Sequence, residues 1–165
     1  MTRRSIQPPL TQKRRPPNCQ STATEIQQCA GRSPQKTALT LYYNQNCWEK
    51  ADHEMFAWTA ANVPDRMKAG LDYVLISYYE DDCNGLQPDW NTVFNRLATM
   101  FPNSKVGIGE CGTTKAASKA TYIDRYYRMN VTAPRFIGGY FWWYFKQDMV
   151  PYTSGLWSTI SSAMQ

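Results

Sequence analysis

Strand-type and helix-type segments alternate from Thr37 onward, and each strand–helix unit is about 30–35 residues long. The expected strands are apolar or aromatic and span 38–43, 72–79, 106–109 and 140–145. Helical patterns follow them at about 52–62, 88–101, 116–129 and 154–164. Because this order connects strands by right-handed crossovers, we expect an α/β fold with a parallel sheet. Four consecutive βα units make half of an eight-stranded (β/α)8 barrel.

The segment 1–36 differs in composition from the expected domain over 37–165. It holds paired prolines, few apolar residues and seven basic residues against one acidic residue, Glu25. Such a segment buries too little apolar surface to offset its ordering entropy, so we expect a disordered or loosely attached tail. An arm for nucleic acid or another anionic surface is the less favoured alternative. The formal net charge of +5 comes from this tail, and the nearly neutral domain indicates no nucleic-acid surface.

The sequence indicates neither a membrane span nor a secretory signal. No apolar stretch is long enough to cross a bilayer. Arg3 and Arg4 are not followed by the apolar segment of a signal peptide. The localisation is therefore left open.

Five cysteines are scattered without a CxxC pair or another metal-ligand spacing, and His53 is the sole histidine. We therefore expect no metal site and no cofactor. Cys47, Cys83 and Cys111 each follow a predicted strand end, on one rim of the sheet, where one pair could form a disulfide. A nucleophilic pair of Cys111 and His53 is disfavoured, because no oxyanion element is evident.

A lone carboxylate, Glu110, follows the predicted strand 106–109. The carboxyl ends of parallel strands are where ligands bind in α/β folds. The next strand lies in the segment 139–145, which is aromatic at nearly every position. A carboxylate beside flat apolar faces suits the cleavage of carbohydrates. A capping or salt-bridged Glu in a turn is the alternative.

Over about residues 37–160, these segments resemble the C-terminal half of a TIM-barrel glycoside hydrolase of the large retaining superfamily called clan A. The seventh strand of that superfamily ends in the nucleophilic Glu, and the resemblance implies this role for Glu110. Its sixth strand often ends in a Tyr near the nucleophile, which corresponds to Tyr78 or Tyr79. Proteins of that family are often secreted.

The eighth strand of the superfamily carries a Trp that forms the floor of the subsite for the cleaved sugar, which corresponds to Trp142 or Trp143. Because side chains alternate along a strand, only one of the two can line the cleft. The acid/base Glu of the superfamily lies at the end of the fourth strand, usually after an Asn, and this sequence holds no Asn-Glu pair. Retaining hydrolysis needs two carboxylates about 5–5.5 Å apart, so a second one must come from elsewhere.

The acidic run Glu80, Asp81 and Asp82 follows the neighbouring strand and could supply that second carboxylate. Repulsion within the run should raise the pKa of at least one member, as a general acid requires. A solvated acidic loop or a cation site is the alternative. Asp148 could flank the cleft from the other side or form a turn, and Asn44 could bind sugar hydroxyls.

Three functions compete. The first is a glycoside hydrolase acting on a polysaccharide or oligosaccharide, and the second is a non-catalytic carbohydrate-binding relic of a truncated barrel. An esterase is disfavoured because no GxSxG motif occurs. The residues expected to be catalytic are Glu110, Glu80 and Asp82. Those expected to bind the substrate are Trp142, Trp143, Tyr78, Tyr79, Asn44 and Asp148.

The expected half-barrel also predicts a homo-oligomer. Its first and last strands, 38–43 and 140–145, would be open sheet edges. In a two-fold dimer the last strand of one copy can pair in parallel with the first strand of the other. Such a closure gives eight strands and places a second Glu110 at the same mouth.

Overall fold

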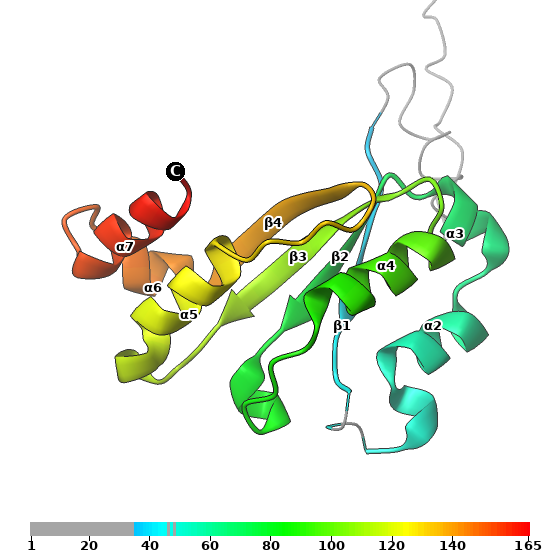
Figure 1. Ribbon diagram of the computed structural model, residues 1–165, viewed down its shortest axis with the longest axis horizontal. Coiled ribbons are helices and arrows are strands. Elements are labelled where there is room, and N and C mark those ends of the chain that lie inside the picture. The colour runs from blue at the N-terminus through cyan, green and yellow to red at the C-terminus, as the bar shows by residue number, and fades with distance from the viewer. Residues whose placement is uncertain (1–34, 46, 48) are drawn as a thin grey trace, which may run out of the picture.

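A computed structural model describes residues 35–45, 47 and 49–165 of the protein (Figure 1). The expected tail 1–36 lies outside these residues except for its last two. The strands of the described chain are β1 (Ala38–Tyr42), β2 (Tyr73–Tyr78), β3 (Lys105–Gly112) and β4 (Phe136–Trp143). Its α-helices are α2 (Met55–Asn62), α3 (Asp65–Gly70), α4 (Trp90–Met100), α5 (Lys119–Tyr127), α6 (Phe145–Met149) and α7 (Gly155–Ala163). Its 3-10 turns are η1 (Ala51–His53), η2 (Glu80–Cys83) and η3 (Ala116–Ser118).

The four strands lie side by side in the order β1-β2-β3-β4, and all neighbours are parallel. This arrangement confirms the expected α/β fold with a parallel sheet. The register pairs Leu41 with Ile76 and Ile76 with Ile108. These three apolar side chains therefore form one row across the sheet and point to the same face.

Helices α4 and α5 lie across that face of the sheet (Figure 1). Between the two layers is a core of fully buried apolar side chains, among them Val74, Ile76, Phe94, Leu97, Ile108 and Ile123. Trp90 of α4 packs its ring against those of Tyr43, Tyr78 and Phe94. The buried residues of α4, Val93, Phe94, Leu97 and Ala98, recur at helical spacing and form the helix side of this core.

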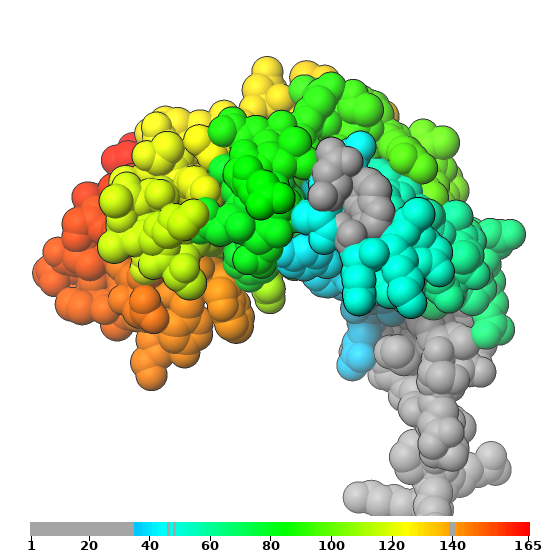
Figure 2. Space-filling model, turned by 90° about the horizontal axis from the view of Figure 1, so that it is seen from below, coloured from blue at the N-terminus to red at the C-terminus, as the bar shows by residue number. Residues whose placement is uncertain are grey.

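The opposite face of the sheet is hollowed. Viewed from the carboxyl ends of the strands, the molecule is an arch that is open on the side away from α4 and α5 (Figure 2). Large apolar side chains remain exposed on the open face, among them Tyr42, Ile137, Phe141 and Trp143. A face of this kind, apolar and concave, is a place where a ligand or a partner can bind.

The boundaries of β3 and β4 differ from the prediction. Strand β3 continues through Cys111 and Gly112, so Glu110 lies within the strand and not in the turn after it. Strand β4 begins earlier than predicted, at Phe136, and ends at Trp143, so that Phe145 belongs to α6. The helix expected over 116–129 is shorter, because η3 precedes α5 and the helix ends at Tyr127.

The glycines of β3 explain the wrong boundary. Glycine usually weakens a strand, but it is also found where two backbones approach closely. A Cβ at Gly107 would overlap the carbonyl oxygen of Gly138, and one at Gly112 would overlap that of Trp143. These glycines therefore let β4 approach β3, and they do not interrupt the strand.

One cysteine pair forms the bridge that the sequence allowed. Cys47 and Cys83 form a disulfide with their Cα atoms 5.1 Å apart, which links the loop after β1 to η2 after β2. Cys111 remains a free thiol, buried within β3. Burial raises the pKa of this thiol to about 12, so it is protonated at neutral pH.

We expect Gly112→Ala to destabilise the fold by about 3 kcal/mol, because the added methyl group must displace the backbone of Trp143. Urea unfolding measures the loss, with Gly70→Ala as the control. The added Cβ of Gly70→Ala enters open space at the end of α3, so its stability should stay within about 1 kcal/mol of wild type. Equal effects of the two substitutions would contradict the close contact between β3 and β4.

Candidate functional site

Glu110 lies on the open face of the sheet and is half-buried. It stands opposite Phe141 in the register of β3 with β4. Its backbone N–H donates to the hydroxyl of Ser77 at 3.3 Å. The hydroxyl of Tyr79 donates to its Oε2 at 3.0 Å. No other partner holds the carboxylate among the described residues, so its second oxygen is available to a ligand.

Tyr79 is the first residue of an aromatic wall on the β1 side of Glu110. Burial has the largest effect on the pKa of Tyr79 and the hydrogen bond to Glu110 the next largest, and both raise it. The phenol therefore stays protonated and acts as a donor. The ring of Tyr42 stacks on that of Tyr79, with centroids 6.2 Å apart and planes at 24°. The hydroxyl of Tyr42 donates to Asp82 Oδ2 at 3.0 Å. Two tyrosines thus connect Glu110 to the carboxylate of Asp82.

A second aromatic surface lies on the β4 side of Glu110. Phe141 and Trp143 point to the open face and are 64% and 54% exposed, whereas Trp142 between them is 2% exposed. The expected alternation of the two tryptophans is therefore confirmed. Trp143 is the one whose ring lies on the same face as Glu110.

Trp142 is fixed from the helix side of the sheet. Its indole N–H donates to Asp148 Oδ2 at 2.8 Å. The other oxygen of Asp148 forms an ion pair with Lys119. Both charged residues are buried. Asp148 therefore joins β4, α5 and α6 at the carboxyl end of the sheet.

A cavity of about 530 Å³ opens at this end of the sheet. Its lining comes from the segment after β3, the start of α5 and the segment from Trp143 to α6. The lining residues are Thr113, Thr114, Lys119, Trp143, Tyr144, Gln147 and Asp148. Since Gly112 pairs with Trp143 just beyond the pair of Glu110 with Phe141, the cavity follows Glu110 along the strands.

The three acidic residues of η2 turn to different partners. Glu80 is buried and forms an ion pair with Arg125, and the hydroxyl of Tyr126 donates to it at 3.0 Å. Both partners belong to α5, so Glu80 lies on the helix side and Glu110 on the open face. This placement argues against the predicted catalytic role of Glu80. Asp82 is linked to Glu110 through Tyr42 and Tyr79.

The expected repulsion within the acidic run is not observed at Asp81. Lys115 donates to Asp81 at 2.7 Å, and the hydroxyls of Thr113 and Tyr122 also donate to it. These hydrogen bonds lower the pKa of Asp81, and the bond from Lys115 has the largest effect. The pKa of Asp81 is thus lowered and not raised, because this carboxylate has three donors of its own.

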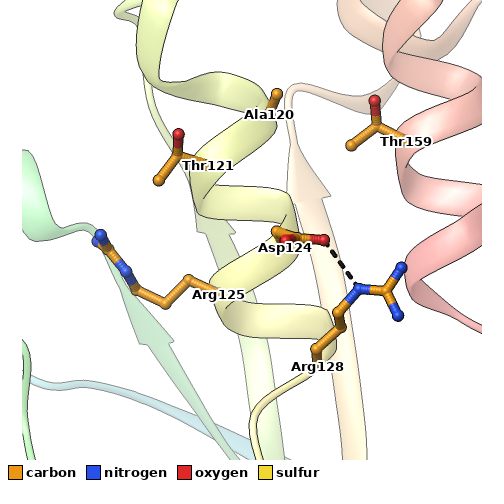
Figure 3. Close-up of a pocket in the computed structure, with 6 residues that line it drawn as sticks. All are labelled: Ala120, Thr121, Asp124, Arg125, Arg128 and Thr159. Carbon is orange, nitrogen blue, oxygen red and sulfur yellow. Dashed lines mark hydrogen bonds and ion pairs between the residues drawn. The ribbon is translucent and has the colours of Figure 1, made fainter.

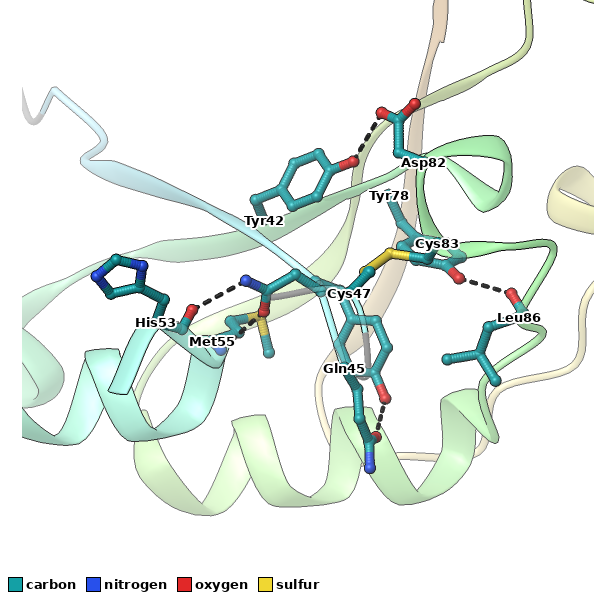
Figure 4. The surroundings of a disulfide bond; sticks show 11 residues. Tyr42, Gln45, Cys47, His53, Met55, Tyr78, Asp82, Cys83 and Leu86 are labelled. Atoms are coloured by element: carbon teal, nitrogen blue, oxygen red, sulfur yellow. Dashed lines mark hydrogen bonds between the residues drawn. A yellow bond between two sulfur atoms is a disulfide. The ribbon is translucent and has the colours of Figure 1, made fainter. Parts of the chain in front are cut away.

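Two predicted substrate-binding residues have structural partners instead. Tyr78 is fully buried, and its hydroxyl donates to the carbonyl of Leu86 at 2.6 Å (Figure 4). The Asn44 amide donates to the carbonyl of His53 at 2.9 Å and accepts from the N–H of Met55 at 3.0 Å. Tyr78 thus belongs to the core, and Asn44 holds the start of α2. Of the two tyrosines that the resemblance left open, Tyr79 is the one in contact with Glu110.

Sequence reasoning missed Tyr42 and Lys119. Tyr42 lay on a predicted strand, and alternation with the apolar Leu41 could have placed it on the open face. Lys119 gave no such signal, because a lysine in the first turn of a helix is usually solvated.

A second hollow, of about 690 Å³, lies between α5 and α7 (Figure 3). Arg128 at its rim bonds to Asp124 at 2.8 Å and to the carbonyl of Ser162 at 3.0 Å. Arg125 is engaged by Glu80. The charges of both arginines are thus already compensated, and the hollow lies away from Glu110.

No group of three or more His, Cys, Asp or Glu side chains is assembled for a metal ion within residues 35–45, 47 and 49–165. In the same residues, no helix is long and apolar enough to cross a bilayer. Comparisons with family models, with curated proteins and with solved structures find no match for the chain. The geometry of the site therefore carries the functional argument.

We predict opposite phenotypes for the two tryptophans of β4. Trp142→Ala should destabilise the fold by about 3–5 kcal/mol, because it opens a cavity in the core and removes a bond to buried Asp148. Trp143→Ala should leave the melting temperature nearly unchanged and weaken the binding of oligosaccharides. Thermal melts and titration calorimetry measure both effects. Two variants that behave alike would contradict the assignment of the two faces.

Proposed function

We propose that this domain is half of a (β/α)8 barrel of the glycoside hydrolase type and that it acts on a polysaccharide or oligosaccharide. The observation that carries the proposal is the setting of Glu110. Its carboxylate is half-buried, held by the phenol of Tyr79 just past β2, and paired in register with the aromatic Phe141 of β4. A sugar chain needs a charge for the chemistry and apolar ring faces for stacking, and this face offers both.

In such a reaction Glu110 attacks the anomeric carbon or activates a water molecule there. The bond from Tyr79 orients Oε2 and leaves Oε1 to the reacting centre. The protonated phenol also stabilises the negative carboxylate before attack. Tyr79 is thus a positioning residue for Glu110.

The proposed reaction also needs a second carboxylate. Glu80 is held by Arg125, and Asp148 is held by Lys119 and Trp142. Asp82 remains, on the open side of the sheet and bonded to Tyr42. We assign it the role of general acid if a single chain is active.

A non-catalytic carbohydrate-binding domain is the second candidate. It is favoured by the partner of Asp82, since a carboxylate that accepts from a phenol is less available as a proton donor. The exposed rings of Phe141 and Trp143 bind a sugar in either case. Catalysis by wild type and by a Glu110 variant separates the two functions.

We expect Glu110→Gln to lower hydrolysis by orders of magnitude, because the amide keeps the shape but removes the attacking charge. The melting temperature should stay the same or rise, as for a residue placed for function at the expense of stability. The assay is the release of reducing sugar from β-glucan, mannan and xylan.

The matched control is Glu49→Gln, the same chemical change at an exposed residue outside the site. It should keep wild-type activity. An active Glu110→Gln protein would end the glycosidase proposal. A wild type that binds the glycans without cleaving them would support the binding domain.

The half-barrel proposal also predicts a two-fold dimer. Strands β1 and β4 are the edges of the described sheet. Parallel pairing of β4 with β1 of a second copy would close the sheet and cover the exposed Phe141 and Ile137. It would also bring a second Glu110 to the shared mouth.

Light scattering at several protein concentrations tests the dimer, with Thr40→Pro as the control. Thr37 and Tyr43 bond to β2, so alternation turns the N–H of Thr40 to the open edge. Proline there should abolish dimers and leave a folded monomer. A monodisperse, folded wild-type monomer at all concentrations would exclude the dimer and its shared site.

A further inference from the structure

The cavity beyond Glu110 contains a charged pair that the proposed reaction does not use. Lys119 and Asp148 are each 7% exposed, and both line the cavity. Charged side chains are rarely buried unless they are paired or serve a ligand. A structural ion pair would need no cavity beside it.

Lys119 and Asp148 both have hydrogen-bonding capacity that the protein itself does not fill. The two oxygens of Asp148 accept from Lys119 and from the indole of Trp142. The ammonium group of Lys119 carries three N–H donors. Asp148 is its one partner in the described part of the chain. Lys119 therefore keeps donors for a molecule in the cavity, and Asp148 keeps a lone pair on each oxygen.

We propose that this cavity is a subsite for one uncharged sugar residue of the substrate, in which Lys119 and Asp148 bind neighbouring hydroxyl groups. The inference rests on the proposed function and adds the class of sugar to it. A hydroxyl both donates and accepts, so a vicinal diol can accept from the ammonium and donate to the carboxylate. Because the pair carries no net charge, a uronic acid or a sulfated sugar would lose the hydration of its own charge in the cavity without a net attraction to replace it.

The rest of the lining suits a sugar ring. The exposed face of Trp143 offers a stacking surface, and Thr114, Tyr144 and Gln147 offer polar groups around it. The volume of about 530 Å³ is within the common range for small-ligand sites. Trp143 lines the cavity and lies two residues beyond Phe141, about 7 Å along the strand from the residue that pairs with Glu110.

Binding is tested on the Glu110→Gln background, so that cleavage does not interfere and the result does not depend on catalysis. Titration calorimetry compares neutral gluco-, manno- and xylo-oligosaccharides with an oligogalacturonate of equal length. We expect at least one neutral ligand to bind more tightly than the oligogalacturonate. Adding Lys119→Met should weaken that binding by about tenfold or more, since a charged hydrogen bond is lost.

Two further variants separate recognition from folding. The double variant Lys119→Met, Asp148→Asn removes both charges and keeps an acceptor for the indole of Trp142. It should be folded and should bind the neutral ligand as weakly as Lys119→Met does. Lys146→Met removes an exposed lysine of α6 and should bind like the parent.

A deoxy oligosaccharide that lacks one vicinal hydroxyl gives the most specific readout. It should bind to the Glu110→Gln protein less tightly than the complete sugar does. The protein that also carries Lys119→Met should bind both sugars with equal affinity. Unchanged affinity in folded Lys119→Met, or tighter binding of the oligogalacturonate, would overturn the subsite. If Lys119→Met and wild type hydrolysed a glycan with the same KM, the subsite would be overturned and the proposed function would remain intact.

Discussion

The close approach of β3 and β4 determines the rest of the site. Glycine at positions 107 and 112 removes the side chains that would hold the two backbones apart. The resulting register places Glu110 opposite Phe141 and Gly112 opposite Trp143. This contact positions the rings of Phe141 and Trp143 beside Glu110. A shift of the register by one residue would exchange Trp142 and Trp143 between core and open face.

Hydrogen-bond donors, in turn, decide which carboxylates remain available. The sheet has helices on one face and an open hollow on the other, and the acidic side chains divide between the two (Figures 1 and 2). Glu80 is neutralised on the helix side by Arg125. Glu110 has a single phenol donor on the open side. Position relative to the sheet, more than position in the sequence, therefore separates a structural carboxylate from a candidate catalytic one.

The disulfide supports the same division. Cys83 is adjacent to Asp82, and Cys47 lies in the loop that follows Tyr42 (Figure 4). The bridge thus restrains the segment that follows Tyr42 and the η2 turn that contains Asp82, the two residues joined by a hydrogen bond. Through the stacked ring of Tyr79, that bond is linked to Glu110. A covalent link near the site restricts loop motion there and preserves the aromatic wall.

The sequence by itself determined the four βα units, because apolar periodicity and helix signals are local properties that act over a few residues. Alternation also determined that Trp142 and Trp143 lie on opposite faces, and strand order placed Glu110 among aromatic residues. Only the tertiary structure decided which tyrosine contacts Glu110, which acid Arg125 neutralises and how Lys119 comes to be buried against Asp148. Those contacts join residues about 30–45 positions apart. They depend on how the helices pack on the sheet, and no local pattern encodes that packing.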